Sequence, residues 1–100
     1  MKLKAKVLIK KISENDVKKM VKDYLSIKKY YHFPILQGLG AKRGIPDIIA
    51  IKNNRVLFLE CKRPGGGKQS DYQKQFQADI EGHGGEYHIV SSLNELIDII

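Results

Sequence analysis

Residues 44–62 read GIPDIIAIKNNRVLFLECK, and in this stretch two apolar runs flank the pair Asn53-Asn54. Asparagine tolerates a positive φ, so this pair between two β-prone runs predicts a tight hairpin turn. If the turn consists of these two residues, Lys52 faces Arg55, and each step back along one strand matches a step forward along the other. The sequence therefore predicts an antiparallel hairpin whose register is fixed by the turn.

The predicted register brings two acids together. Asp47 lies near the start of the first run and Glu60 near the end of the second, so they face each other with Cβ atoms roughly 4.5–5.5 Å apart. Strand alternation points Lys62 to the same face. Facing carboxylates repel, and a buried charge is costly unless it is paired. Lysine offsets part of this repulsion, and Mg²⁺, which one or two carboxylates can hold, would offset more. The alternative interpretation is a surface hairpin with scattered charges.

The positive charge of the chain is concentrated at its N-terminal end. The formal net charge is +7. Residues 1–33 contain ten lysines against three acids, whereas residues 34–100 contain eight basic and eight acidic side chains. Basic surfaces attract polyanions, and each neutralised phosphate adds affinity that does not depend on sequence. This distribution indicates a nucleic-acid partner, although a solvated, lysine-rich helix face is the alternative.

The length and composition favour one α/β domain over residues 1–100, with a basic N-terminal segment at 1–12. The single cysteine, Cys61, excludes an internal disulfide. No signal peptide or membrane-spanning run is visible, which is typical of a cytoplasmic protein. The run GGGKQS lacks the first glycine and the hydroxyl residue of a phosphate-binding P-loop. The three histidines have no metal-ligand spacing with Cys61, which argues against zinc.

Helix-start signals predict three helices. Each signal is a serine N-cap followed three residues later by a side chain that can complete a capping box. These pairs are Ser13 with Asp16, Ser70 with Gln73, and Ser92 with Glu95. At helical spacing, the apolar face of the first helix consists of Val17, Met20, Val21, Tyr24 and Leu25. The inward face expected for the last helix consists of Leu93, Leu96, Ile97 and Ile100.

Glu14 lies in the first turn of the first predicted helix, on its apolar face. An acid in a first turn is favoured by the helix dipole, which is the simplest reason for its presence. Because that face is directed toward the core, Glu14 is also a candidate third acid for the site. Phe76 and Ile80 share the face of the second helix with Gln73, at helical spacing.

The remaining segments predict strands and loops. Residues 1–12 fit either an edge strand or the approach to the first helix. Residues 29–36 predict a strand that Pro34 confines to an edge or a strand end, and Pro46 opens the first hairpin strand. A short strand is expected over 87–90. The order of helix, strand, hairpin, helix, strand and helix predicts a mixed sheet with helices packed against it.

Two glycine-rich basic loops, residues 37–44 and 63–69, flank the predicted hairpin. Four of their side chains are candidate DNA contacts, because each could pair with a phosphate. They are Lys42, Arg43, Arg63 and Lys68.

The ordered motifs together resemble the VRR-NUC family of the PD-(D/E)XK nuclease superfamily, in particular its short stand-alone bacteriophage members. The resemblance covers roughly residues 13–98. Its elements are an acid opening the first helix (Glu14), Gly44-Ile45-Pro46-Asp47, Glu60-Cys61-Lys62 followed by Arg63-Pro64-Gly65-Gly66, a helix beginning Ser70-Asp71-Tyr72-Gln73, and Gly84-Gly85 before a strand. The resemblance implies a restriction-endonuclease-like mixed β-sheet flanked by helices, with an αβββαβ core and a short C-terminal helix.

The resemblance also implies a role for each matching residue. Asp47, Glu60 and the backbone carbonyl of Cys61 would bind Mg²⁺ or Mn²⁺, and Glu14 would hold a metal-bound water or a second metal. Lys62 would orient the attacking water or offset charge on the phosphate. Gln73 would bind near the metal water or the scissile phosphate, and its capping role is compatible with that. The family often has valine where this chain has Cys61, whose side chain should point to the opposite face.

The leading hypothesis is a Mg²⁺- or Mn²⁺-dependent DNA endonuclease that prefers branched DNA such as four-way junctions or flaps. Relatives of this stand-alone type imply a homodimer, acting in the host cytoplasm if the chain is encoded by a phage. The alternative is a non-catalytic DNA-binding module, or a subunit of a phage replication or recombination complex. A nuclease acting on RNA or single strands is a third possibility, because nothing in the sequence reads a 2′-hydroxyl.

Overall fold

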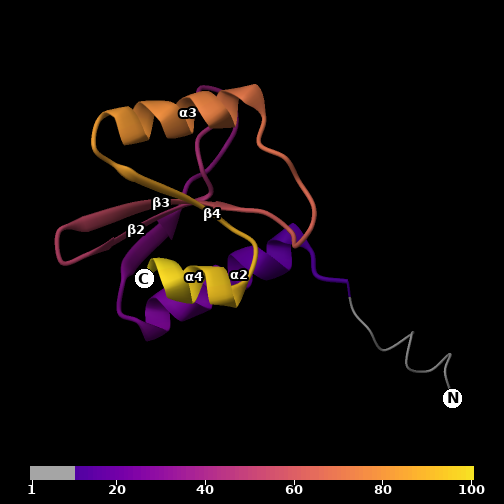
Figure 1. Ribbon diagram of the computed structural model, residues 1–100, viewed down its shortest axis with the longest axis vertical. Helices are drawn as coiled ribbons and strands as arrows, with labels where there is room; N and C mark the ends of the chain where they lie inside the picture. The colour runs from indigo at the N-terminus through magenta and orange to yellow at the C-terminus, as the bar shows by residue number, and fades with distance from the viewer. Residues whose placement is uncertain (1–10) are drawn as a thin grey trace, which may run out of the picture.

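A four-stranded mixed β-sheet forms the middle layer of the molecule (Figure 1). The computed structural model describes residues 11–100, so most of the basic N-terminal segment lies outside the described residues. The strands, in their order across the sheet, are β1 (Tyr31–Pro34), β2 (Ile48–Lys52), β3 (Arg55–Cys61) and β4 (Glu86–Val90). β1, β2 and β3 pair antiparallel, whereas β3 and β4 pair parallel.

Helices cover both faces of this sheet. They are α2 (Glu14–Ile27), α3 (Asp71–Gly82) and α4 (Leu93–Ile99). In Figure 1, α3 lies above the sheet, and α2 and α4 lie side by side below it. The predicted α/β class and the αβββαβα order of elements are confirmed. Within residues 11–100, no helix is long and apolar enough to cross a bilayer.

The hairpin has the predicted register. Asn53 and Asn54 have φ values of 51° and 66°, and a two-residue turn with a positive φ at both positions is a type I′ turn. Lys52 pairs with Arg55, and Ile48 pairs with Leu59. Beyond the last ladder pair, the Asp47 N–H donates to the Leu59 carbonyl at 3.0 Å. The hairpin therefore extends to the point where Asp47 and Glu60 meet.

The main core lies between the sheet and the layer of α2 and α4. Its members are Val17, Val21, Leu25, Ile48, Ala50, Leu57, Leu59, Cys61, Val90 and Leu96. On the opposite face, Phe76 of α3 packs against the rings of Phe58 and Tyr87. The odd-numbered residues of β3 thus face α2, and Phe58 faces α3. This alternation assigns Glu60 and Lys62 to the α3 side.

Helix α4 differs from its prediction. Leu96 is fully buried, but Leu93 and Ile97 are 41% and 45% exposed. A helix of seven residues has only about two turns and buries only a narrow face, here at Leu96, so the predicted inward face was too broad. The predicted capping box is also changed. Ser92 Oγ accepts from the Glu95 N–H, but the Glu95 carboxylate accepts from the N–H of Ser91.

Two strands are shorter than predicted. β1 begins at Tyr31 because α2 ends at Ile27 and Lys29, at a φ of 62°, forms the turn that follows. Pro34 closes this edge strand, as its missing N–H requires. β2 begins at Ile48, so the buried Pro46 precedes the strand and does not open it.

Candidate active site at the open end of the hairpin

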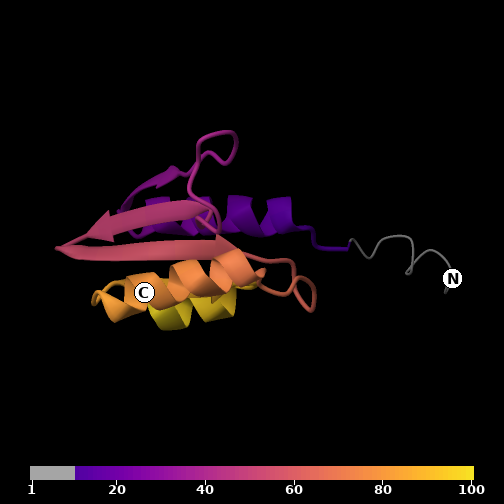
Figure 2. The same ribbon diagram turned by 90° about the horizontal axis from the view of Figure 1, so that it is seen from above.

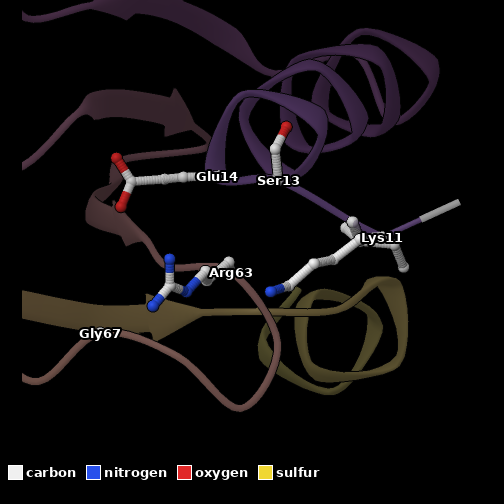
Figure 3. Close-up of a pocket in the computed structure, with 6 residues that line it drawn as sticks. Lys11, Ser13, Glu14, Arg63 and Gly67 are labelled. Carbon is white, nitrogen blue, oxygen red and sulfur yellow. The ribbon is translucent and has the colours of Figure 1, made fainter.

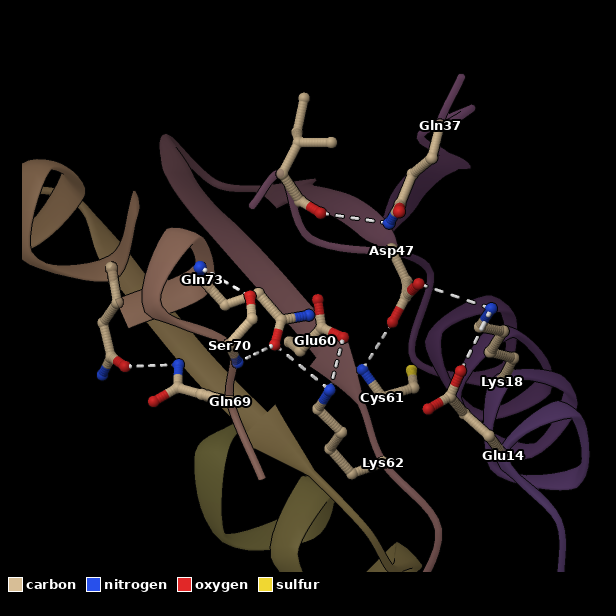
Figure 4. Close-up of polar contacts among 12 residues, drawn as sticks. Glu14, Lys18, Gln37, Asp47, Glu60, Cys61, Lys62, Gln69, Ser70 and Gln73 are labelled. Atoms are coloured by element: carbon tan, nitrogen blue, oxygen red, sulfur yellow. Dashed lines mark hydrogen bonds and ion pairs between the residues drawn. The ribbon is translucent and has the colours of Figure 1, made fainter. Parts of the chain in front are cut away.

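Three parts of the chain meet at the open end of the hairpin: the first turn of α2, the ends of β2 and β3, and the first turn of α3 (Figure 4). They enclose a cleft of about 330 Å³. Its lining consists of Glu14, Lys18, Ile35, Leu36, Gln37, Asp47, Glu60, Lys62 and Gln73. The structure therefore brings together all five side chains that the sequence predicts as catalytic.

The carboxylate of Asp47 is held by two contacts, one to each of its oxygens. The residue is 8% exposed. Its Oδ2 accepts from the Cys61 N–H at 2.7 Å, and its Oδ1 lies 3.4 Å from Lys18 Nζ. These contacts join the start of β2 to the end of β3 and to α2. The orientation of this carboxylate is therefore fixed before any ligand binds.

Glu60 is more deeply buried and less well paired. The residue is 3% exposed; Oε2 lies 3.6 Å from Lys62 Nζ. Oε1 is a buried oxygen without a hydrogen-bond partner. Burial, followed by the negative charge of Asp47, raises the pKa of Glu60 to about 7, although the Lys62 charge acts in the opposite direction. An unpaired buried carboxylate oxygen is costly in a folded protein.

Lys62 is positioned by the start of α3. Its Nζ donates to Gln73 Oε1 at 3.2 Å. The same Oε1 accepts from the Ser70 N–H at 2.9 Å, and the Gln73 N–H donates to Ser70 Oγ at 3.2 Å. The capping box thus fixes the side-chain amide of Gln73, and this amide in turn positions the ammonium group of Lys62. Gln73 performs the capping role and the site contact at the same time, and a lysine held in this way has lost much of its rotamer freedom.

Lys18 also belongs to the site, although it was not among the residues predicted from the sequence. Its Nζ lies between Asp47 Oδ1, at 3.4 Å, and Glu14 Oε2, at 3.7 Å. Burial alone would lower the pKa of Lys18, but the charge and hydrogen bond of Asp47, with the charge of Glu14, outweigh it and raise the pKa. The available signal was the spacing of four residues from Glu14, which places both side chains on one side of the helix.

The donor set fits a hard divalent cation. Among residues 11–100, no three side chains of His, Cys, Asp or Glu converge as ligands, so Glu14 stays outside the pair formed by Asp47 and Glu60. The Cys61 N–H points toward the Asp47 carboxylate. In an extended strand, the N–H and the C=O of one residue point to the same edge of the strand, so the Cys61 carbonyl also faces the Asp47 side. Two carboxylates and a carbonyl are oxygen ligands of the kind that Mg²⁺ or Mn²⁺ prefers.

The side chain of Cys61 takes no part in this donor set. It is fully buried in the core beneath α2, on the opposite face, as predicted. Burial, reinforced by the charges of Asp47 and Glu60, raises the pKa of its thiol to about 12. The thiol therefore stays protonated and cannot act as a thiolate ligand.

The predicted DNA-binding residues are not gathered in one place. Arg63 lines a recess of about 540 Å³ on the other side of Glu14, into which Lys11 also extends (Figure 3). Lys11 was not predicted. Lys42 and Arg43 line a separate hollow beside α3, where the guanidinium of Arg43 stacks on the Tyr72 ring at 4.9 Å and donates to its hydroxyl. Lys68 is exposed on the loop between β3 and α3.

The chain is similar to a curated phage protein. No family model matches the chain. A curated protein of Acyrthosiphon pisum secondary endosymbiont phage 1, described as "Putative nuclease p44", is 35% identical over 52 residues. The aligned part covers 51% of this chain and 55% of the relative. The chain thus spans about half the length of the curated relative that it matches.

Proposed function

We propose that this chain is a Mg²⁺- or Mn²⁺-dependent DNA endonuclease of the PD-(D/E)XK type, related to the VRR-NUC family. The observation that carries the proposal is the buried pair of Asp47 and Glu60, one of whose oxygens is unpaired, beside the ammonium group of Lys62. Such an arrangement is unfavourable for stability alone, and a cation would relieve it. Similarity to a phage protein named as a nuclease is further support.

In this proposal, Asp47, Glu60 and the Cys61 carbonyl hold the metal ion. When bound, such an ion supplies an activated water and charge stabilisation at a phosphodiester. Lys62, fixed by Gln73 at 3.2 Å, faces the reacting phosphate and offsets the negative charge that develops on its oxygens. Glu14 lies at the mouth of the cleft, with a side chain 45% exposed. It can accept a hydrogen bond from an incoming water.

The substrate of this proposal is branched duplex DNA, and the acting species is a homodimer. The basic recess of Lys11 and Arg63 lies beside Glu14 and would pair with phosphates on either side of the cut, since phosphate contacts position a duplex without reading its sequence. Two copies would bring one cleft to each of two strands. Sedimentation of the free protein tests the oligomeric state.

The cleavage test compares labelled four-way junction, flap, linear duplex, single-stranded DNA and RNA, each with Mg²⁺ and with EDTA. We expect metal-dependent cutting of the branched substrates. Asp47→Asn should abolish cutting and leave DNA affinity intact or raised, because it removes a negative charge. Asp23→Asn is the matched control, since Asp23 is an exposed acid of α2 that pairs with Lys19 on the surface. DNA binding without cutting of any substrate would favour the non-catalytic module.

A further inference from the structure

The loop between β1 and β2 displays an apolar tip beside the cleft. This loop, residues 35–47, stands off the plane of the hairpin in Figure 2. Leu36 is 85% exposed, and Leu39 is completely exposed. Single exposed leucines are ordinary on protein surfaces. The position of these two is the unusual feature, because Leu36 also lines the cleft that contains Asp47 and Glu60.

The tip is a tight turn with open space around it. The Ala41 N–H donates to the Gly38 carbonyl at 3.0 Å, which makes Leu39 and Gly40 the central residues of a four-residue turn. Gly40 has a φ of 87°, as the third residue of a type II turn requires. Neither Gly38 nor Gly40 has an atom within 4 Å of the place where a Cβ would stand. Leu39 is therefore presented to solvent by the backbone itself.

The base of the loop is fixed, in contrast to its tip. The Ile35 N–H donates to the Asp47 carbonyl at 2.7 Å, and Gln37 Nε2 donates to the Ile45 carbonyl at 3.1 Å (Figure 4). Gly44 packs so closely on α3 that a Cβ there would lie 2.1 Å from the Tyr72 carbonyl oxygen. The hydrogen bond from Ile35 ends on a site residue. The distance between the apolar tip and the carboxylates is therefore set by backbone contacts.

We propose that Leu39, at the tip of this loop, is a wedge that inserts between base pairs of DNA held in the cleft. The inference rests on the proposed nuclease function and names the feature that would select branched substrates. Exposed Lys42 follows in the same loop and would contact a phosphate next to the insertion point. Apolar side chains that enter a base step unstack it, and a junction or flap end is already partly unstacked. The wedge therefore favours branched DNA over a continuous duplex.

Unstacking can be measured without cleavage. Full-length Asp47→Asn protein is mixed with flap DNA that carries 2-aminopurine at the branch, or with a linear duplex that carries it at a central position. We expect 2-aminopurine fluorescence to rise on binding the flap and to change little on the linear duplex. Adding Leu39→Ser should remove most of the rise. It should also reduce the ratio of flap to linear affinity by about tenfold, as expected for one buried leucine.

Ile27→Ser in the same background is the matched control. Ile27 is 71% exposed at the far end of α2, about 20 Å from Glu14 along the helix, and its replacement should leave both readouts unchanged. Circular dichroism should show the same melting curve for Leu39→Ser, since the side chain has no buried surface to lose. Equal fluorescence and equal affinity ratios for Leu39→Ser and its parent would overturn the proposal. A homodimer that dissociates on Leu39→Ser would also overturn it, by assigning the loop to the contact between copies.

The wedge and the nuclease activity can fail separately. Wild-type and Leu39→Ser proteins are therefore assayed for cutting on the same oligonucleotides with Mg²⁺. Cutting whose preference for flaps survives Leu39→Ser would refute the wedge and leave the nuclease in place. Leu39-dependent unstacking without cutting by the wild-type protein would refute the nuclease and leave the wedge.

Discussion

At the scale of single residues, the molecule keeps Glu60 where its charge is disfavoured. The carboxyl group is buried, faces Asp47, and has one oxygen without a hydrogen bond. Lys62 lies 3.6 Å from the other oxygen and relieves only part of this cost. Buried unpaired groups of this kind are concentrated at functional sites. The local loss of stability is therefore the signature on which the proposed function rests.

Glu60→Gln should stabilise the metal-free protein. In the folded state, the pKa of Glu60 is raised from 4.5 to about 7, so the folded protein binds more protons than the unfolded chain between these values. The wild type therefore loses stability as the pH rises from about 4.5 to 7, and the loss is constant above that. The Gln variant lacks this loss. Its advantage in the free energy of unfolding should grow across this window by up to about 3 kcal/mol, the free-energy equivalent of a pKa shift of this size.

Urea denaturation in EDTA at several pH values measures this advantage. Asp98→Asn, which changes an exposed acid of α4, is the control and should show no such growth. A Glu60→Gln protein less stable than wild type at pH 8 would mean that the carboxylate is well accommodated without a metal. The explanation of the site would then be wrong.

Lys18→Met should destabilise the metal-free protein by about 1 kcal/mol, because the buried Asp47 loses its neighbouring cation. The Lys18 and Asp47 atoms lie 3.4 Å apart. Mg²⁺ should restore more stability to this variant than it adds to the wild type, since the ion replaces the missing charge. Thermal melts with and without Mg²⁺ measure both effects. Lys19→Met is the control: its partner Asp23 is exposed, and the change should leave the melting curve unchanged. Equal losses for both variants would remove Lys18 from the site.

At the scale of elements, the sequence predicted the features that depend on residues close together in the chain, which are turns, hairpin register and helix starts. Asn53-Asn54 fixed the turn and the register of the hairpin, and Ser13 and Ser70 marked two helix starts with complete capping boxes. The two acids and Lys62 followed from that register. The partners of α4 could not be predicted in the same way, because its inward face depends on how closely it approaches α2 and β4. The contact of Lys18 with Asp47 could not be predicted for a similar reason, because it depends on how α2 packs beside the start of β2.

The contact between the β1–β2 loop and α3 should be sensitive to one methyl group. Gly44→Ala would bring a Cβ to 2.1 Å from the Tyr72 carbonyl oxygen, at a φ of 78°. We expect a loss of about 2–3 kcal/mol in the free energy of unfolding, because backbone on both sides must move. Gly84→Ala has a similar φ of 82° but open space, and should cost about 1 kcal/mol. Denaturant melts that show equal costs would mean that the loop is not pinned there.

At the scale of the whole molecule, the exposed basic residues within 11–100 lie on several elements and do not form one patch. Lys11 and Arg63 lie on one side of Glu14, and Lys68 is exposed on the loop before α3. The chain as a whole carries a formal charge of +7. Such a distribution favours binding through phosphates, with an affinity that depends strongly on salt. In the proposed function, these residues would hold DNA without reading its sequence.

Replacing both Arg63 and Lys68 with Gln should reduce the dependence of DNA affinity on salt. Each lost phosphate contact lowers the slope of log K against log salt by about 0.9. The double variant should therefore bind all sequences more weakly, with a slope smaller by about two. Fluorescence anisotropy over a salt series measures this. Lys28→Gln, at the far end of α2, is the control. An unchanged slope in the double variant would place the DNA elsewhere on the surface.

The most direct test of the site is a crystal of the wild-type protein soaked in Mn²⁺, with anomalous diffraction recorded above the manganese absorption edge. We predict one strong peak within ligand distance of the Asp47 carboxylate, the Glu60 carboxylate and the Cys61 carbonyl, and its loss in crystals of Asp47→Asn. At saturating Mn²⁺, a cleft without a peak, or a peak that persists in Asp47→Asn, would contradict the claim that these two carboxylates share a metal ion.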